Sequence, residues 1–506
     1  MQNWLRMFFL FWAVGLAVYF NSLNNKFLMD DLAFLKNPAM SQVRFMPSQW
    51  NPYLAQEMGV YRPMAHMLLD FSYGTFRNSY WKYHLFNLTL FVFVSLLVSV
   101  LVEKLTGEGQ LAFLAGFFYL IHPVNGIIVN YMSASVFAFE AIFMLGAILL
   151  LLASLERQND RGLYFLSLAF CFFSLFWHEN GVMVPFYVSA VILFFRKDPF
   201  MQKARVLLPY FLIVFSYVIF RAVYFPPVNT GLLKQLALSH MSGWWYPAAM
   251  FQVYSWYIGK LFFPQGIVMQ WAVPFMQGHA VLNVLGAVLL AVSFVLLFFR
   301  FRRDALCLLA LTWLVIGFAP ALLASMVRSY TCAVIEPHWF VFSSIGFFML
   351  AARLCVFVFS RMKNAGMVLV FILVMVWCSF SHAYNRIWAD QKTYAFYWLQ
   401  QAPYYTPIYT YIAYAQMMEG DFKASRMWFT RALSGRPADE LIYVNLGVMA
   451  QAEGRLQAAE GNYKMALKIN PYSADAFSRL QSVRQAQVRQ TRSEDSSAGE
   501  GKHEKL

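Results

Sequence analysis

The sequence predicts an all-α membrane protein with many transmembrane helices, followed by a small helical repeat domain. Hydrophobic residues make up 60% of the 506 residues and charged residues only 13%, whereas soluble domains contain roughly 25% charged residues. The hydrophobic residues form long blocks, each close to the roughly 20 residues that cross a bilayer. A polar region with a period of 34 residues follows the last block.

The apolar blocks predict about 11–13 transmembrane helices. They lie near residues 4–20, 83–102, 110–129, 133–154, 162–177, 181–196, 206–225, 280–299, 305–326, 339–360 and 365–383. A further block near 244–264 either spans the membrane or is re-entrant. The first block is interpreted as an uncleaved signal anchor, because bulky residues and no small-residue cleavage site follow it.

Short basic loops predict the orientation, because loops rich in Lys and Arg stay in the cytoplasm. The candidate loops are 155–162, 194–205, 298–304 and 360–364. Their placement puts the first long loop, 21–80, and everything after about residue 384 outside the cytoplasm. We expect a bacterial inner membrane with the active site and repeats in the periplasm, or alternatively the endoplasmic reticulum membrane with a lumenal site. The net charge of +14 comes without an aromatic-interleaved basic patch for nucleic acid.

The polar region carries an internal repeat. Tyr409, Gly420, Phe429, Ala432, Leu433 and Pro437 recur 34 residues later as Tyr443, Gly454, Tyr463, Ala466, Leu467 and Pro471. Glycine between two helices and proline after the second are typical of tetratricopeptide repeats. We predict a repeat domain over 385–487 and a disordered tail over 488–506. The repeats either cap the membrane domain or present a concave surface to a protein acceptor.

Several ionisable residues cluster in the loops on the predicted non-cytoplasmic side. Such groups are costly at membrane depth and tend to be functional. They are Asp30, Asp31, Arg62, His84, His122, Glu179, Arg328, Glu336 and His338. We therefore predict the functional site in residues 1–384, with a large contribution from the loop 21–80.

The segments around these residues resemble a known family. "NKFLMDDLAFLKNP", "YRPMAHMLLDFSYG", "HPVNGIIVNYMSAS", "HENGVMVPFY" and "IEPHWFVFSSIGF" follow in the order seen in the transmembrane-and-tetratricopeptide-repeat (TMTC-like) O-mannosyltransferases of the GT-C superfamily. The resemblance implies a GT-C-type fold over 1–384. It also implies an inverting glycosyltransferase that moves a sugar from a polyprenyl-phosphate donor to an acceptor, such as a protein hydroxyl, on the non-cytoplasmic face.

The acidic pair takes the catalytic role that the resemblance implies. Asp30 is the expected general base, since a carboxylate can accept the proton of an attacking hydroxyl. Asp31 would orient the acceptor, raise its neighbour's pKa by like-charge repulsion or help hold a metal. The cofactor is unknown: the pair could bind Mg²⁺ or Mn²⁺ through oxygen ligands, or no ion. Alternatively, the pair only caps a juxtamembrane helix.

Three arginines are the expected ligands of the donor phosphate, because a guanidinium can grip two phosphate oxygens. They are Arg62, Arg328 and Arg221, the last with the alternative of a snorkelling rim residue. The expected contacts to acceptor or donor are His84, His122, Glu179, Glu336 and His338. His122 could equally be an interfacial histidine that ends a helix before Pro123.

The sequence departs from the family pattern in one loop. Asn125, Ile127, Ser135 and Phe137 stand where the family has His, Glu, Arg and Asp. The departures imply a different sugar, a different lipid, a metal-free site or lost activity. Two rival functions stay open: a lipid-linked glycan polymerase or ligase, and a non-catalytic scaffold for export or assembly that uses its repeats. A transporter ranks last, because Glu140 is the main ionisable residue at mid-membrane. The expected partners are the lipid-linked donor, a protein acceptor and membrane lipid.

Overall fold

The structure is a computed structural model that describes residues 2–29, 31, 61–224, 245–272, 289, 292–325, 334–403, 405, 407–435 and 439–503. Two of the predicted site residues, Asp30 and Arg328, lie outside the described residues. The chain forms two compact units, Met1–Asp390 and Gln391–Leu506. Unit 1 contains the apolar blocks and unit 2 contains the repeats.

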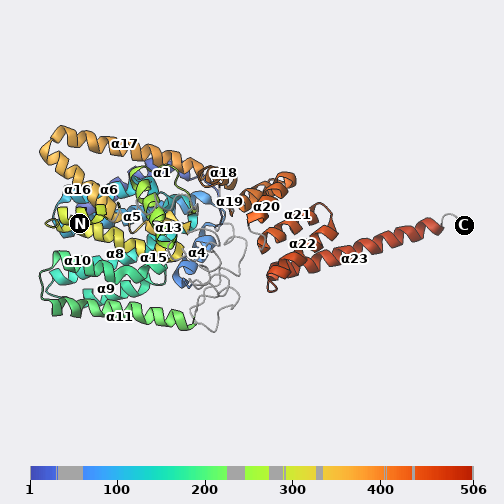
Figure 1. Cartoon of the computed structure of the whole chain (residues 1–506), viewed down its shortest axis with the longest axis horizontal. Helices are drawn as coiled ribbons and strands as arrows, with labels where there is room; N and C mark the ends of the chain where they lie inside the picture. The colour runs from blue at the N-terminus through green and yellow to red at the C-terminus, as the bar shows by residue number, and fades with distance from the viewer. Residues whose placement is uncertain are drawn as a thin grey trace. The chain divides into compact units, whose positions relative to one another are not determined.

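Unit 1 is almost entirely helical (Figure 1). Its α-helices are α1 (Gln2–Tyr19), α4 (Pro63–Phe76), α5 (Tyr80–Thr106), α6 (Gly109–Ile121), α7 (Ile127–Asn130), α8 (Ser135–Glu156), α9 (Arg161–Ser174), α10 (Val184–Phe195), α11 (Phe200–Tyr224), α13 (Trp245–Phe262), α15 (Ala305–Ser325), α16 (Ile345–Arg361) and α17 (Lys363–Ile387). Short 3₁₀ turns are η1 (Phe20–Ser22), η4 (Pro123–Asn125), η5 (Met132–Ala134), η6 (Glu179–Met183) and η8 (Pro337–Phe340). The two-residue strands β1 (Trp271–Ala272) and β2 (Val334–Ile335) pair antiparallel.

Every predicted apolar block contains a helix within the described residues, and the all-α prediction is confirmed. Five of these helices are long and apolar enough to cross a membrane: Asn3–Ser22, Tyr80–Thr106, Met132–Glu156, Phe200–Tyr224 and Lys363–Ile387. A sixth span results if Gly109–Ile121 and Pro123–Asn130, bent by 58°, count as one. The number is below the predicted 11–13 because other blocks form shorter apolar helices: Arg161–Ser174, Glu179–Phe195 and Ala305–Pro320.

The predicted cytoplasmic loops share one end of unit 1. Figure 1 shows the turns from α10 to α11 and from α16 to α17 at the same end of the helices. Ion pairs connect further loops there: Lys104 pairs with Glu156 at 2.5 Å, and Arg353 contacts both Glu108 at 2.9 Å and Asp304 at 3.0 Å. The opposite end therefore collects the loops predicted to face away from the cytoplasm.

Helix α5 is central in this unit and packs against α1, α6 and α8. Close approach of α5 and α6 depends on Gly116. A Cβ atom there would lie 2.4 Å from the Ser95 carbonyl oxygen and 2.1 Å from Ser99 Oγ. Small residues at helix contacts let backbones approach closely, which is how helices associate within lipid.

A buried asparagine network fixes the start of the first outer loop. Asn130 on α7 accepts a bond from Ser22 Oγ (2.8 Å) and donates to Asn385 Oδ1 on α17 (2.8 Å). Asn385 donates in turn to the Val18 carbonyl oxygen (3.0 Å), and Asn25 donates to the Asn385 carbonyl oxygen (2.9 Å). The end of α1 and the residues before Asp31 are thereby tied to α7 and α17.

Unit 2 consists of α18 (Gln391–Gln401), α19 (Pro407–Met418), α20 (Phe422–Gly435), α21 (Glu440–Ala452), α22 (Leu456–Ile469) and α23 (Ala474–His503). The pairs α19–α20 and α21–α22 turn at Gly420 (φ 83°) and Gly454 (φ 73°), where glycine adopts the left-handed conformation at least cost. Gly447 lets α21 approach Tyr463, since a Cβ atom would lie 2.5 Å from the ring. The two helix pairs agree with the predicted tetratricopeptide pattern.

The ends of the repeat domain differ from the sequence-based boundaries. Helix α17 continues to Ile387 and the units divide after Asp390, rather than at 384. Helix α23 continues to His503, whereas the sequence predicts a disordered tail from 488.

The asparagine network gives a first prediction. Asn385→Ala removes bonds to Asn130, Asn21 and the Val18 carbonyl and should destabilise unit 1 by about 1–3 kcal/mol, the usual cost of unsatisfied buried polar groups. Thermal unfolding of the purified chain in detergent measures this. Asn462→Ala is the matched control, because this side chain bonds a carbonyl of its own helix at the surface. Equal melting temperatures for both variants would contradict the assigned role.

Candidate functional site

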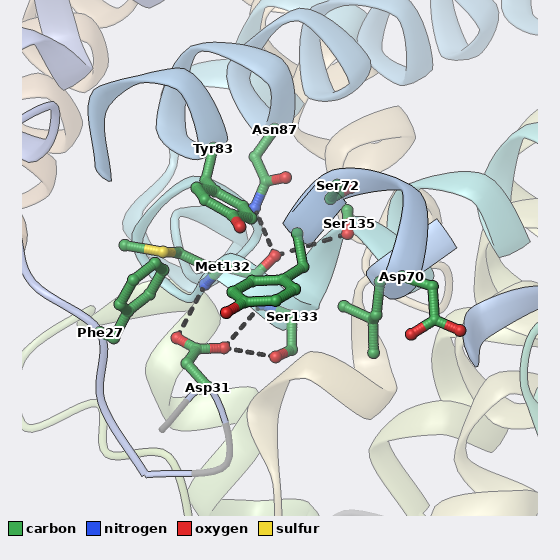
Figure 2. A pocket seen from close by; sticks show the side chains of 11 residues that line it. Phe27, Asp31, Asp70, Ser72, Tyr83, Asn87, Met132, Ser133 and Ser135 are labelled. Atoms are coloured by element: carbon green, nitrogen blue, oxygen red, sulfur yellow. Dashed lines mark hydrogen bonds between the residues drawn. The ribbon is translucent and has the colours of Figure 1, made fainter. Parts of the chain in front are cut away.

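Asp31 lies in a pocket at the end of unit 1 opposite the ion pairs of Lys104 and Arg353 (Figure 2). Its side chain is buried and accepts backbone N–H bonds from Met132 (3.3 Å) and Ser133 (2.9 Å), and a bond from the Ser133 hydroxyl. The carboxylate thus holds the loop between α7 and α8. This geometry favours a positioning role for Asp31 and leaves the base assignment with Asp30.

Asn87 on α5 holds the same loop from the other side. Its amide lies within hydrogen-bonding distance of the carbonyl oxygens of Ile128 (3.0 Å), Tyr131 (3.1 Å) and Met132 (3.0 Å). The pocket is lined by aromatic and polar side chains: Phe27, Asp31, Leu69, Asp70, Ser72, Tyr73, Tyr83, Asn87, Met132, Ser133 and Ser135. It is therefore a preformed, mostly apolar recess with carboxylates on α4 and on the first outer loop.

In a second group of side chains, two of the predicted arginines contact the same carboxylate. Arg62, directly before α4, donates to Glu179 Oε2 through Nε (2.8 Å) and through a terminal nitrogen. Arg221, at the end of α11, donates to Glu179 Oε1 (3.0 Å). We call Arg62, Glu179 and Arg221 the arginine clamp. The side chains are 21–32% exposed, so the clamp is reachable from outside.

The Glu179 carboxylate is ionised because of its neighbours. Burial raises its pKa, but the charges of Arg62, His178 and Arg221 outweigh this and hold the pKa well below the usual range. His178 lies between two acids, with Nε2 3.6 Å from Glu179 and Nδ1 3.5 Å from the buried Glu140. One carboxylate therefore joins two guanidinium groups.

Glu336 and His338 form a separate buried pair beside this region. His338 Nε2 lies 2.9 Å from Glu336 Oε2, and Gln270 donates to the other carboxylate oxygen. The ring of Phe137 packs between the two histidines, with centroid distances of 4.9 Å to His178 and 4.4 Å to His338. Phe137, one of the departures from the family pattern, therefore fills the space between these two pairs.

Two predicted contact residues are fully buried and occupied within the protein. His84 places Nδ1 2.7 Å from the Val129 carbonyl oxygen and Nε2 3.0 Å from the Asn25 carbonyl oxygen. His122 accepts from the Val124 N–H (3.2 Å) and contacts the Leu261 carbonyl oxygen (3.1 Å). In this structure neither side chain offers a ring nitrogen to a substrate. For His122, the geometry favours the alternative of a histidine that ends a helix.

Two helices connect the Asp31 pocket to the arginine clamp. Arg62 precedes α4 and Asp70 on the same helix lines the pocket, a separation of about 12 Å along the helix. On α8, Ser135 lines the pocket, and Glu140 approaches His178 from the next turns. The pocket and the arginine clamp therefore share the helices α4 and α8 and lie about two turns apart along α4.

Sequence reasoning missed several residues of this region. Asp70 is in the quoted motif "YRPMAHMLLDFSYG", where its place two turns after Arg62 was the available indication. The sequence analysis places Glu140 at mid-membrane without a role in the site, and it does not select His178. Among the described residues, no three His, Cys, Asp or Glu side chains gather to hold a metal ion. Asp30, one of the two predicted metal ligands, lies outside the described residues.

The fold and these side chains define an all-helical membrane protein with charged clusters at one end of its helices and a tetratricopeptide-like domain. In sequence, it is similar to protein O-mannosyl-transferase TMTC2 of Mus musculus and of Homo sapiens, each 28% identical over 194 residues, and to that of Xenopus laevis, 28% identical over 199 residues. Each match covers 35% of this chain and 23% of the relative.

These matches confirm the TMTC-like resemblance of the sequence. The chain spans about a quarter of the length of the curated relatives that it matches. No family model matches the sequence, and no solved structure matches it.

The arginine clamp gives a second prediction. Glu179→Gln leaves two guanidinium groups without their counter-charge and should destabilise the chain by about 1–2 kcal/mol, a value reduced by the partial exposure of the clamp. Because the native pKa of Glu179 is depressed, its contribution is present above the unfolded-state pKa of about 4.3. The contribution disappears as the pH falls through the native pKa.

Thermal unfolding of wild type and Glu179→Gln at pH 7 and at about pH 3 measures this difference. The two melting temperatures should differ at pH 7 and converge in acid. The matched control is Glu156→Gln, which removes an exposed ion pair with Lys104 at the other end of the unit. A difference for Glu179→Gln that is independent of pH would contradict the assigned electrostatics.

Proposed function

We propose that the chain is an integral membrane glycosyltransferase that transfers mannose from a polyprenyl-phosphate donor to a protein hydroxyl on the non-cytoplasmic face. The observation that carries this proposal is the convergence of Arg62 and Arg221 on Glu179 beside the Asp31 pocket. The names of the relatives support the reaction class, since all three are protein O-mannosyl-transferases.

The arginine clamp is the proposed site of the donor phosphate. Each guanidinium has five N–H donors, and the two arginines meet at one carboxylate. The phosphate of a lipid-linked sugar would accept charge-assisted bonds from both arginines. Glu179 then keeps the two arginines close together when no donor is bound, because without it the like charges would repel.

Asp30 is the proposed general base. The acceptor hydroxyl oxygen forms a bond to the anomeric carbon, its proton passes to the carboxylate, and the bond from that carbon to the phosphate oxygen breaks with its electron pair. The charge that develops on the departing lipid phosphate is stabilised by Arg62 and Arg221. Asp31 holds the loop between α7 and α8 through Met132 and Ser133 and so supports its neighbour's position.

The remaining parts of the proposal concern placement. The division into residues 1–384, 385–487 and 488–506, the periplasmic side of a bacterial inner membrane and the recruitment of a protein acceptor by the repeats stay predictions. They are consistent with basic loops that share the opposite end of unit 1 from the arginine clamp.

A transfer assay tests the function. The full chain in lipid nanodiscs receives polyprenyl-phosphate mannose and a Ser/Thr-rich peptide, and transferred mannose is counted. We expect Asp30→Asn to lower turnover by roughly 10²–10⁴-fold and Arg62→Gln by roughly 10²–10³-fold. The matched control Arg303→Gln, in a basic loop, should retain full activity. Full activity in both Asp30→Asn and Arg62→Gln would reject the mechanism, and no transfer by wild type would favour the scaffold.

A further inference from the structure

A second polar cavity lies at the end of unit 1 opposite the arginine clamp. It is bounded by α8, α9, α10 and α11 and lined by Ser154, Leu155, Asn159, Arg161, Tyr164, Ile192, Arg196, Asp198, Gln202, Lys203, Arg205 and Val206. Lys203 and Arg221 are both on α11, about 27 Å apart along the helix. The cavity is therefore separate from the proposed glycosyl-transfer site and independent of it.

The walls of the cavity are held together by hydrogen bonds between helices. Tyr164 on α9 donates to the Val206 carbonyl oxygen on α11 (2.9 Å). One turn deeper, Ser167 on α9 contacts the Ala147 carbonyl oxygen on α8 and the Tyr210 hydroxyl on α11, both at 2.5 Å. Because α8, α9 and α11 are fixed in this way, the cavity is preformed.

Positive charge is in excess around this cavity. Four cations line it, namely Arg161, Arg196, Lys203 and Arg205, against one acid, Asp198. Asp198 pairs with Arg196, whose Nε donates to Oδ2 at 2.8 Å. Within the described part of the chain, Arg161, Lys203 and Arg205 form no ion pair, whereas Arg353 at the same end contacts two carboxylates. Asp198 also interacts electrostatically with Lys203, so the four cations share one carboxylate and the lining keeps an excess of positive charge.

Large apolar side chains surround the cavity on the lipid-facing surface. Phe200 is 81% exposed and Met201 63% exposed at the start of α11, and Phe165 is 65% exposed on α9. Within a bilayer such side chains contact acyl chains. A ligand with an anionic head and apolar tails therefore fits this part of the surface better than a soluble anion does.

We propose that this cavity binds the phosphate-bearing headgroup of an anionic membrane lipid. Arg161, Lys203 and Arg205 are the ligands of the phosphate, and Arg196 is held in place by Asp198. Basic pockets between transmembrane helices bind phosphate headgroups in this manner. A bias of positive loops toward the cytoplasm explains the sign of the charge, but it does not require a preformed cavity lined by four cations and one acid.

Native mass spectrometry of the purified full chain tests the proposal, with phosphatidylglycerol and phosphatidylcholine as probes. Wild type should retain one phosphatidylglycerol under conditions that remove phosphatidylcholine. Lys203→Gln combined with Arg205→Gln should weaken this binding at least about tenfold, as expected when two charge-assisted contacts are lost. Arg302→Gln with Arg303→Gln, in the other basic loop, is the matched control and should bind like wild type.

The charge-conserving pair Lys203→Arg with Arg205→Lys should also retain the lipid, which separates loss of charge from loss of fold. Equal retention of phosphatidylglycerol by wild type and the glutamine pair would overturn the proposal. So would equal retention of phosphatidylcholine by wild type. Inorganic phosphate that competes fully at millimolar concentration would overturn the assignment to a lipid and indicate a soluble phosphate ligand instead.

Discussion

The contact of Glu179 with Arg62 and Arg221 is the interaction on which the proposed site depends. Charged groups near lipid are stable only when they are paired, and this carboxylate joins the residue before α4, the turn before α10 and the end of α11. Removing one partner of such a cluster lowers the stability of the protein by more than the pair adds to it, because the remaining charge is left without its counter-charge. The same arrangement keeps two guanidinium groups close enough to bind one phosphate.

The rest of unit 1 fixes the described start of the first outer loop, residues 21–29 and Asp31. Asp31 bonds the loop between α7 and α8, Asn87 bonds the same loop, and Asn130 and Asn385 tie it to α1 and α17. Buried polar networks are stabilising only when every member is satisfied. This network therefore fixes the residues directly before Asp30. It also explains why buried asparagines cluster at this end of an otherwise apolar unit.

The sequence predicted the helices but not their contacts. Apolar blocks and the 34-residue period are local patterns, so the helices could be predicted from them. The same holds for the turns at Gly420 and Gly454 between the paired helices of the repeats. The convergence of Arg62, Glu179 and Arg221 depends on tertiary packing of distant segments, which no local pattern contains. His84 and His122 were predicted as substrate contacts, yet they point into the protein, because spacing alone does not say which way a helix is rotated. Five described helices can span a membrane by length and composition, or six if the pair bent at His122–Pro123 is one span, and the predicted block 280–299 lies partly outside the described residues.

The most direct test of the account is the mannose carried by proteins in cells that lack the chromosomal copy and express variants of the chain. Wild type should restore a hexose mass on membrane or secreted proteins, and Arg62→Gln combined with Arg221→Gln should not restore it at equal expression. Restoration by the double variant would contradict the role of the arginine clamp as the donor-phosphate site. An unchanged glycan mass in the deletion itself would contradict the transferase function.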